Sequence, residues 1–325
     1  MMFSFIRKQK HKNNKPFYYL RNFVRYIIPK CFYRAMLGHK LARLEKEDKE
    51  YILRRVNYYN KLEENTPLDV TKSVALKDFK LQRKKGNVYF FDTYEYTRYF
   101  SDDNRIVTLF GDITKVPDTP SLTKSRPIAG DNANSVILKL NKIRHYTFVN
   151  DGRRFCDKKD MLIGRACIKQ PQRVRFWQMY FNHPMCDLGQ INANNVVCPE
   201  WIKPSISIDE HLDYKFILCI EGFDVASNLK WVMSSNSLAV MPRPKYETWF
   251  MEGTLVPDYH YVCIKDDYSD LDEKLNYYIA HPDEAQAIIE HAHEYVAQFR
   301  NNKREDLISL LVLKKYFEKT GDARQ

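Results

Sequence analysis

A polar cluster separates two apolar runs within residues 220–241, which read IEGFDVASNLKWVMSSNSLAVM. The apolar run KFILCI leads into the cluster, and SLAVM follows it. One Asp or Ser side chain is enough to cap a helix start, so capping explains one of these acids but not the whole cluster. Helix N-termini also favour anions. We therefore predict a ligand-binding loop whose candidate residues are Glu221, Gly222, Asp224, Asn228 and Lys230.

A second candidate loop carries basic side chains. The stretch LIGRACIKQPQR places Arg165, Lys169 and Arg173 where a predicted strand passes through a loop into a predicted helix. Guanidinium groups match phosphate oxygens in a bidentate manner, so the two loops together could cradle a diphosphate. A basic run by itself is more often a solvated face. The chain has neither a P-loop nor a GxGxxG motif to identify a nucleotide directly.

The sequence favours a site without metal. The DLD stretch at Asp270–Asp272 resembles a metal-binding DxD motif, but it opens a predicted acidic helix, where solvated first-turn acids are the better interpretation. No grouping of His, Cys and Asp has the spacing of a metal site. The seven Cys residues include no CxxC pair. They support neither a zinc ribbon nor a disulfide framework, and they fit a reducing cytoplasm.

The elements that position both loops are predicted from hydrophobic periodicity. Short strands alternate with helices over residues 158–265, which predicts an open α/β layer with a parallel sheet. Ligands of such sheets bind at the carboxyl ends of the strands, where both loops fall. Elsewhere we expect strands over 105–113 and 145–151, and strand-like structure over 87–100 whose second half could be helical. We also expect a helix over 226–235, a long helix broken near His281, and an amphipathic helix over 303–319.

Positive charge is concentrated at the N-terminus. Residues 1–44 hold 11 of the 52 Lys and Arg residues and no acid, so the other 41 basic residues balance the 41 acidic ones. A nucleic-acid enzyme more often spreads its charge along a groove, so we expect no nucleic-acid partner. No apolar run approaches the length of a membrane span. Aromatic and aliphatic residues mixed with arginines suit an anionic membrane surface. A disordered basic tail and an aromatic helix packed on the body are the alternatives.

Several blocks, in order, resemble glycosyltransferase family 90, the CAP10-like family, and are closest to its bacterial lipopolysaccharide-biosynthesis branch. The resemblance covers about residues 85–300. It implies two Rossmann-like domains facing a cleft, the GT-B type, here with a helical basic N-terminal segment and a C-terminal crossing helix. It also implies an inverting transferase that uses a UDP-sugar and binds no metal or other cofactor. The blocks are KSRPI (124–128), NSVILKLNKIRHY (134–146), FNHPMCDLGQIN (181–192), IEGFDVASNLKWVMSSNSLAVMP and ETWFMEG.

The resemblance also assigns roles to residues. Asp112, in LFGDITKVP, matches the family's proposed general base, although it could instead cap a turn after Gly111. Arg165 and Arg173 match two basic positions that grip the donor diphosphate, and Ala166 departs from the family's usual glycine. The implied donor site consists of Arg165, Lys169, Arg173, Glu221, Gly222, Asp224, Val225, Ala226, Ser227, Asn228 and Lys230; candidate substrate contacts are Ser125, Arg126 and Trp249.

Four segments follow from this interpretation. Residues 1–44 are expected to contact a membrane surface, 45–145 to form an acceptor-side domain, 146–295 to bind the UDP-sugar donor, and 296–325 to form a helix packing back on the first domain. The expected protein is cytoplasmic and peripheral on the inner face of the cell membrane. It would transfer a hexose or pentose to a lipopolysaccharide core or other lipid-linked saccharide. The alternative is a non-catalytic protein that binds an anionic glycan or lipid headgroup at the membrane surface.

Overall fold

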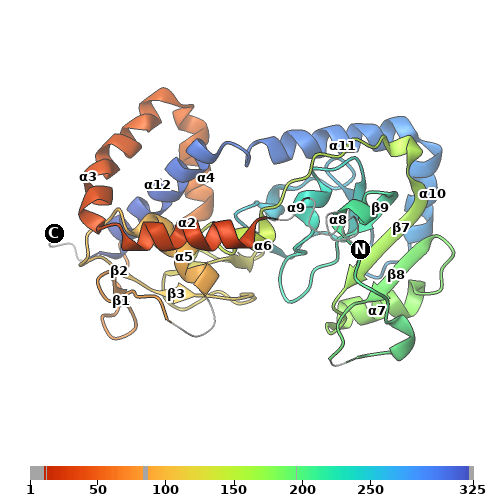
Figure 1. Ribbon diagram of the computed structural model, residues 1–325, viewed down its shortest axis with the longest axis horizontal. Coiled ribbons are helices and arrows are strands. Elements are labelled where there is room, and N and C mark those ends of the chain that lie inside the picture. The colour runs from red at the N-terminus through yellow and green to blue at the C-terminus, as the bar shows by residue number, and fades with distance from the viewer. Residues whose placement is uncertain (1–10, 12, 83–86, 195, 322–325) are drawn as a thin grey trace. The chain divides into compact units, whose positions relative to one another are not determined.

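The chain forms two compact units in the computed structural model, which describes residues 11, 13–82, 87–194 and 196–321 (Figure 1). We call them the sheet unit and the helical unit. The sheet unit holds Arg144–Pro244, Gly253–Gln298 and the N-terminal residues up to Asn13; the helical unit holds Asn14–Ile143, Lys245–Glu252 and Phe299–Gln325.

The sheet unit is built on five parallel strands in the order β12-β10-β9-β7-β8. Parallel neighbours require crossover connections, and short helices supply them. The prediction of an open parallel α/β layer is therefore confirmed. Its elements are β7 (Lys159–Ala166), α7 (Pro171–Tyr180), β8 (Cys186–Gln190), α8 (Ile208–His211), β9 (Tyr214–Leu218), α9 (Leu229–Val232), β10 (Leu238–Met241), β12 (Val262–Cys263), α10 (Leu271–Ala280), α11 (Pro282–Ala297) and the 3₁₀ turns η2 (Phe155–Asp157) and η3 (Pro199–Trp201).

The core of the sheet unit surrounds the strand centres. Leu162 of β7, Phe216 of β9 and Val240 of β10 are buried, together with Phe176 and Trp177 of α7. Such near-continuous apolar strands are typical of parallel sheets, which are covered on both faces. The break expected near His281 is confirmed, because α10 ends at Ala280 and α11 begins at Pro282, the first-turn position that proline tolerates best.

The helical unit contains six helices and two 3₁₀ turns among its described residues, and its strands are only two or three residues long. Strands β3, β4 and β6 form a parallel sheet, while β1 pairs with β2 and β5 with β11 in antiparallel fashion. Its elements are α2 (Lys15–Ile27), α3 (Lys30–Leu41), η1 (Ala42–Lys46), α4 (Lys49–Tyr59), β1 (Val74–Ala75), α5 (Asn87–Thr97), β2 (Arg105–Ile106), β3 (Thr108–Leu109), β4 (Ser121–Thr123), β5 (Ser125–Pro127), β6 (Ser135–Ile137), α6 (Lys142–His145, which ends in the sheet unit), β11 (Tyr246–Thr248), η4 (Glu252–Thr254, likewise) and α12 (Asn302–Thr320).

Several sequence-based expectations are corrected here. The aromatic run over 87–100 is mainly helix α5, which is buried on every side from Phe90 to Thr97. A helix apolar all round has no one-sided stripe to distinguish it from a strand. The described residues after His145 form no strand up to 151, and the helix expected over 226–235 shortens to α9. The single strand expected over 105–113 is divided into the two-residue strands β2 and β3. The described part of the helical unit has a parallel sheet of three short strands, which does not confirm the second Rossmann-like domain that the resemblance implies.

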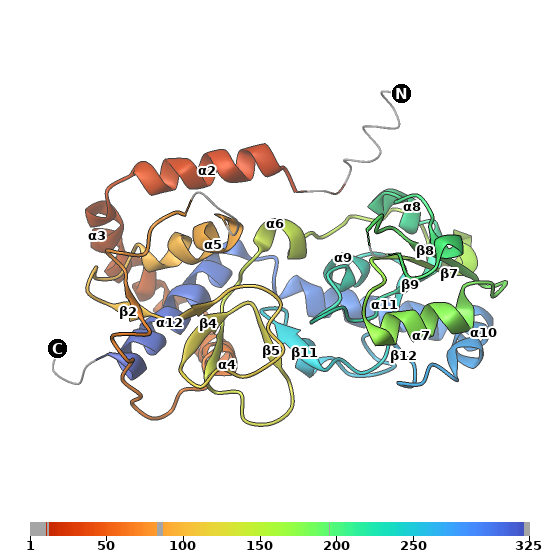
Figure 2. The ribbon, with the colours of Figure 1, turned by 90° about the horizontal axis from the view of Figure 1, so that it is seen from below.

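The last helix packs against elements far away in the sequence. Helix α12 lies against α4 and α5 within the helical unit (Figure 2). Glu305 of α12 accepts hydrogen bonds from Arg55 Nη1 of α4 at 2.5 Å and from Trp249 Nε1 at 2.6 Å. All three side chains are buried. This ionic cluster connects three segments of the unit inside its core.

The buried carboxylate of Glu95 makes stability depend on pH. Burial raises its pKa, but Lys142 and Arg25 outweigh burial and hold the pKa at about 2. The unfolded chain therefore takes up this proton first as the pH falls, so the stabilisation is present above pH 4.5 and is lost towards pH 2. The full effect is about 3 kcal/mol. We expect Glu95→Gln to flatten the decline of the urea midpoint between pH 5 and pH 3.

The control for this experiment is Glu45→Gln, which removes an exposed acid of the same unit. The quantity to compare is the slope of the urea midpoint against pH, because this slope distinguishes the contribution of Glu95 from that of Asp92. Burial raises the pKa of Asp92 to about 6, so its contribution changes with pH in the opposite direction. Identical slopes for Glu95→Gln and the unaltered protein would show that the Glu95 ion pairs do not carry this pH dependence.

Candidate active site

The strand order of the sheet unit reverses at β7. From β7 the chain moves outward to the edge strand β8 and then returns to β9 on the other side of β7. In doubly wound sheets, ligands bind at the carboxyl ends of the strands where the order reverses in this way. The basic loop follows β7, and the polar loop at 219–228 follows β9. The topology thus brings both sequence motifs to the same edge of the sheet.

Arg173 of α7 fastens the two loops together. Its Nη1 donates to the Cys167 carbonyl at 3.0 Å, while its Nη2 and Nε donate to the Ile220 and Glu221 carbonyls at 2.9 and 3.1 Å. Gly222 lies against the guanidinium, because a Cβ at that position would stand 3.2 Å from Nη2. A guanidinium carries five N–H groups, so two remain beyond these three bonds.

The positive charge of Arg173 is not neutralised by a carboxylate of the described chain, where its hydrogen bonds go to carbonyl oxygens. Burial lowers the pKa of Arg173, and the nearby Arg144 lowers it further. Arg144 is exposed. The sequence analysis did not select it as a site residue, because it is a single basic residue within the family block NSVILKLNKIRHY. Two cations near the switch point of a parallel sheet favour the approach of an anion to this end of the sheet.

Arg165 has a different environment. Its Nη2 donates to Asp187 Oδ1 at 2.9 Å and its Nη1 to the Asp187 carbonyl at 2.7 Å, which links β7 to β8. The Arg165 side chain is only 8% exposed, and Lys203 also pairs with Asp187. Because its charge is already paired, Arg165 is a weaker candidate for a phosphate contact than Arg173. Lys169 is exposed in the loop that follows β7.

The polar loop after β9 is closely held. Asn228 donates from Nδ2 to the Leu218 carbonyl at 2.9 Å, and the Gly222 N–H donates to the Asp224 carbonyl at 3.0 Å. Lys230 is fully buried on α9, with its ammonium 5.8 Å from the centre of the Tyr146 ring. The remaining predicted residues divide by exposure: Asp224, Val225 and Ala226 are buried, whereas Glu221, Gly222, Ser227 and Asn228 are partly exposed.

Asp112 lies in the helical unit on a loop held by the segment KSRPI. The buried Lys124 ammonium donates to Asp112 Oδ1. The Ile113 N–H donates to Ser125 Oγ at 3.2 Å, and Ser125 Oγ donates to the Ile113 carbonyl at 3.3 Å. Gly111 has a φ of 121°, which favours glycine. The side chain of Asp112 is 35% exposed, so its carboxylate is held by Lys124 and is also accessible to solvent. The sequence analysis missed Lys124.

The three candidate substrate contacts are buried supports of the helical unit. Arg126 donates from Nε to Glu247 at 2.8 Å, and the Trp249 ring stacks on Tyr59 with centroids 3.8 Å apart. Ser125 secures the Asp112 loop, and all three are at most 1% exposed. Their polar groups have partners inside the unit, and burial leaves these three side chains almost no surface for a substrate to contact.

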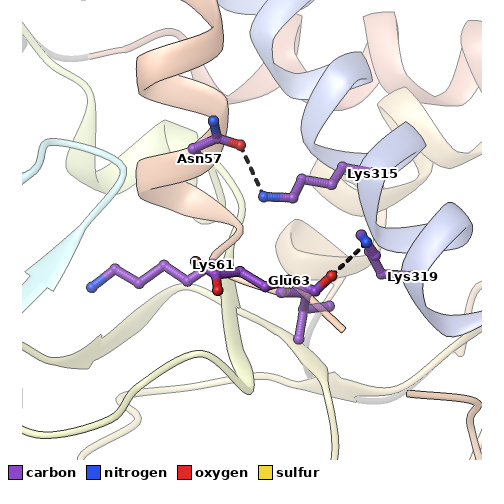
Figure 3. Close-up of a pocket in the computed structure, with 6 residues that line it drawn as sticks. Asn57, Lys61, Glu63, Lys315 and Lys319 are labelled. Atoms are coloured by element: carbon purple, nitrogen blue, oxygen red, sulfur yellow. Dashed lines mark hydrogen bonds between the residues drawn. The ribbon is translucent and has the colours of Figure 1, made fainter. Parts of the chain in front are cut away.

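A separate cavity of about 470 Å³ in the helical unit has a basic lining (Figure 3). Lys315 donates from Nζ to Asn57 at 2.9 Å, and Lys319 donates to the Glu63 carbonyl. Burial lowers the pKa of Lys315 and, together with Arg126, that of Lys61. None of the six lining residues is among those predicted from the sequence, so the cavity does not enlarge the predicted site.

The acidic DLD stretch lies at the start of α10 without a side-chain cap. Asp270 accepts a hydrogen bond from the Lys265 N–H at 2.8 Å, and Asp272 lies 3.3 Å from His183. The described residues contain no cluster of three His, Cys, Asp or Glu side chains arranged to hold a metal ion. Metal independence remains a prediction. In the described ranges, no helix combines the length and apolar character needed to cross a bilayer.

A parallel α/β sheet with two arginines near its switch point is typical of α/β proteins that bind a ligand at the carboxyl ends of their strands. The sequence model for Glycosyl transferase family 90 matches residues 192–316. The O-glucosyltransferase LpsA of Dichelobacter nodosus is 39% identical over 294 residues, which cover 90% of this chain and 91% of that protein. The chain belongs to glycosyltransferase family 90 and is a glycosyltransferase. The resemblance noted from the sequence is confirmed.

Proposed function

We propose that the protein is an inverting, metal-independent glycosyltransferase that moves a hexose or pentose from a UDP-sugar to a hydroxyl of a lipopolysaccharide core or other lipid-linked oligosaccharide. The name of the relative makes UDP-glucose the first donor to test. The observation that carries the proposal is the partly buried Arg173 at the switch point of the sheet unit, whose guanidinium bonds to carbonyl oxygens and meets no carboxylate of the described chain. We place the protein in the cytoplasm at the inner face of the cell membrane, with contact through residues 1–44.

The chemistry requires two functions, which we assign to residues of different units. The sheet unit would bind the donor, and the helical unit would supply Asp112, as the GT-B arrangement implies. An acceptor oxygen attacks the anomeric carbon, the bond to the diphosphate breaks, and the hydroxyl proton passes to Asp112. Extra negative charge then appears on the departing UDP. Preorganised donors such as Arg173 stabilise that charge more in the transition state than in the ground state, by about 2.7–4 kcal/mol for one donor.

Thermal unfolding with added nucleotides tests the donor site. A ligand that binds only the folded protein raises its melting temperature. We expect a rise with UDP and with one UDP-sugar, no rise with GDP or CMP, and no change on adding a chelator. Arg173→Met should abolish the rise, whereas the control Arg154→Met removes an exposed arginine of the same unit and should retain it. No response to any nucleotide by folded protein would overturn the donor site and favour the glycan- or headgroup-binding alternative.

A further inference from the structure

Helix α2 directs its polar face towards helix α5 of the same unit. Tyr18 donates from its hydroxyl to Asp92 Oδ1 at 2.7 Å, and Arg25 Nη2 lies 2.7 Å from Glu95 Oε1. Both acids belong to α5 and are buried. Tyr26 adds edge-to-face contacts with rings of α5. The inward face is therefore held by charged and aromatic contacts rather than by aliphatic packing.

The outward face of α2 is apolar. Ile27 is 78% exposed, Leu20 63% and Phe17 61%. A surface helix ordinarily buries its apolar stripe and exposes its polar face, so α2 has the reverse orientation. We call the exposed side chains the apolar strip; they are Phe17, Leu20, Phe23, Val24, Ile27, Ile28, Phe32 and Met36, the last two on α3.

The contacts beneath α2 keep it from rolling over to hide the strip. Rotation about the helix axis would break the ion pair between Arg25 and the buried Glu95, and it would leave Asp92 without the Tyr18 hydroxyl. Separating a buried charge from its partner is strongly unfavourable. The apolar strip therefore stays outward unless another surface covers it, and contiguous exposed apolar patches of this kind mark interaction sites.

The charge pattern identifies the surface that covers the strip. Lys15 and Arg21 are exposed on α2, and residues 1–44 contain 11 basic residues and no acid. An apolar face accompanied by unopposed positive charge fits the interface of an anionic bilayer, where lipid tails receive the side chains and headgroups meet the cations. A protein partner would not require the complete absence of acids from this segment.

We propose that the helical unit docks on an anionic phospholipid surface through the apolar strip, with α2 lying along the plane of the membrane. The apolar side chains enter the boundary between headgroups and acyl chains, while Tyr18 and Arg25 attach the helix to the body of the unit. Helix α2 is thus a rigid docking element rather than a flexible tail. The inference rests on the proposed function for its purpose, because a lipid-linked acceptor is presented at a membrane.

Co-sedimentation with vesicles tests this docking and involves no sugar transfer. The probe is the full chain with vesicles of phosphatidylcholine alone or with about one third phosphatidylglycerol. We expect binding to the anionic vesicles and a loss of about tenfold or more in partitioning for the double variant Leu20→Gln/Ile27→Gln. Arg21→Gln should weaken binding about fivefold, in line with one basic residue at a charged surface.

The matched control is Val70→Gln/Ile202→Gln, which removes two exposed aliphatic side chains elsewhere and should bind like the unaltered protein. A UDP-dependent rise in melting temperature, measured on every variant, reports the donor site separately, so a failure of docking is distinguishable from a failure of the proposed function. Equal vesicle binding by the strip variant, or no vesicle binding by the unaltered protein, would overturn the proposal. Strip-dependent dimerisation without vesicle binding would assign the strip to a second copy instead.

Discussion

Asp112→Asn is expected to lower kcat by about 10²- to 10⁴-fold while leaving UDP binding intact. The amide keeps the size of the side chain but cannot accept the proton of the acceptor hydroxyl, and general base catalysis typically contributes a factor of this size. The Ser125 contacts to Ile113 hold the loop without the Asp112 side chain. The amide oxygen of Asn can still accept the hydrogen bond from Lys124, so the substitution should not displace the loop. Transfer of label from the UDP-sugar identified by thermal unfolding measures the effect.

The control for Asp112 is Asp118→Asn, an exposed acid further along the same loop. It should retain full activity, and both variants should show the UDP-dependent rise in melting temperature. If Asp112→Asn transferred sugar at the normal rate, Asp112 would be only a turn residue after Gly111. The proposal would then need another base. Loss of UDP binding together with activity would instead indicate that the substitution disturbs more than proton transfer.

Glu305→Gln is expected to destabilise the protein by about 3–5 kcal/mol, because it leaves buried cations without their counter-charge. Arg55 Nη1 lies 2.5 Å and Lys139 Nζ 3.6 Å from the carboxylate, and all three side chains are nearly inaccessible. Burial raises the pKa of Glu305, but Lys139 and Arg55 outweigh it and lower the pKa overall. The melting temperature should fall by about 10 °C, since each kcal/mol shifts it by a few degrees in proteins of this size.

Glu318→Gln is the matched control for Glu305, because Glu318 stands on the same helix and pairs with Lys314 on the surface. Exposed pairs of this kind contribute about 0.3–0.5 kcal/mol. The two variants therefore make the same chemical change at buried and exposed positions. Equal melting temperatures for both would mean that the ionic cluster does not hold α12 in the unit.

Local pattern was sufficient to predict the sheet unit. Apolar runs such as KFILCI ended in polar clusters and alternated with helical stretches, so strands β7 to β10 and the parallel sheet followed from the sequence. Because ligands of parallel sheets meet the carboxyl ends of the strands, the two candidate loops were predicted as well. Helix α5 was not, since its aromatic residues face every direction and periodicity alone does not separate a buried helix from a strand.

The sequence by itself determined the family, the parallel sheet and the loops that carry the candidate residues. Only the tertiary structure decided which charges remain available to a ligand. It paired Arg165 with Asp187, gave Arg173 carbonyl partners, and placed Asp92 and Glu95 beneath α2 so that the apolar strip faces outward. The physical reason is the separation in sequence between the residues that interact. Backbone periodicity is set by neighbouring residues, whereas the partner of a charge is whichever group folding brings within hydrogen-bonding distance.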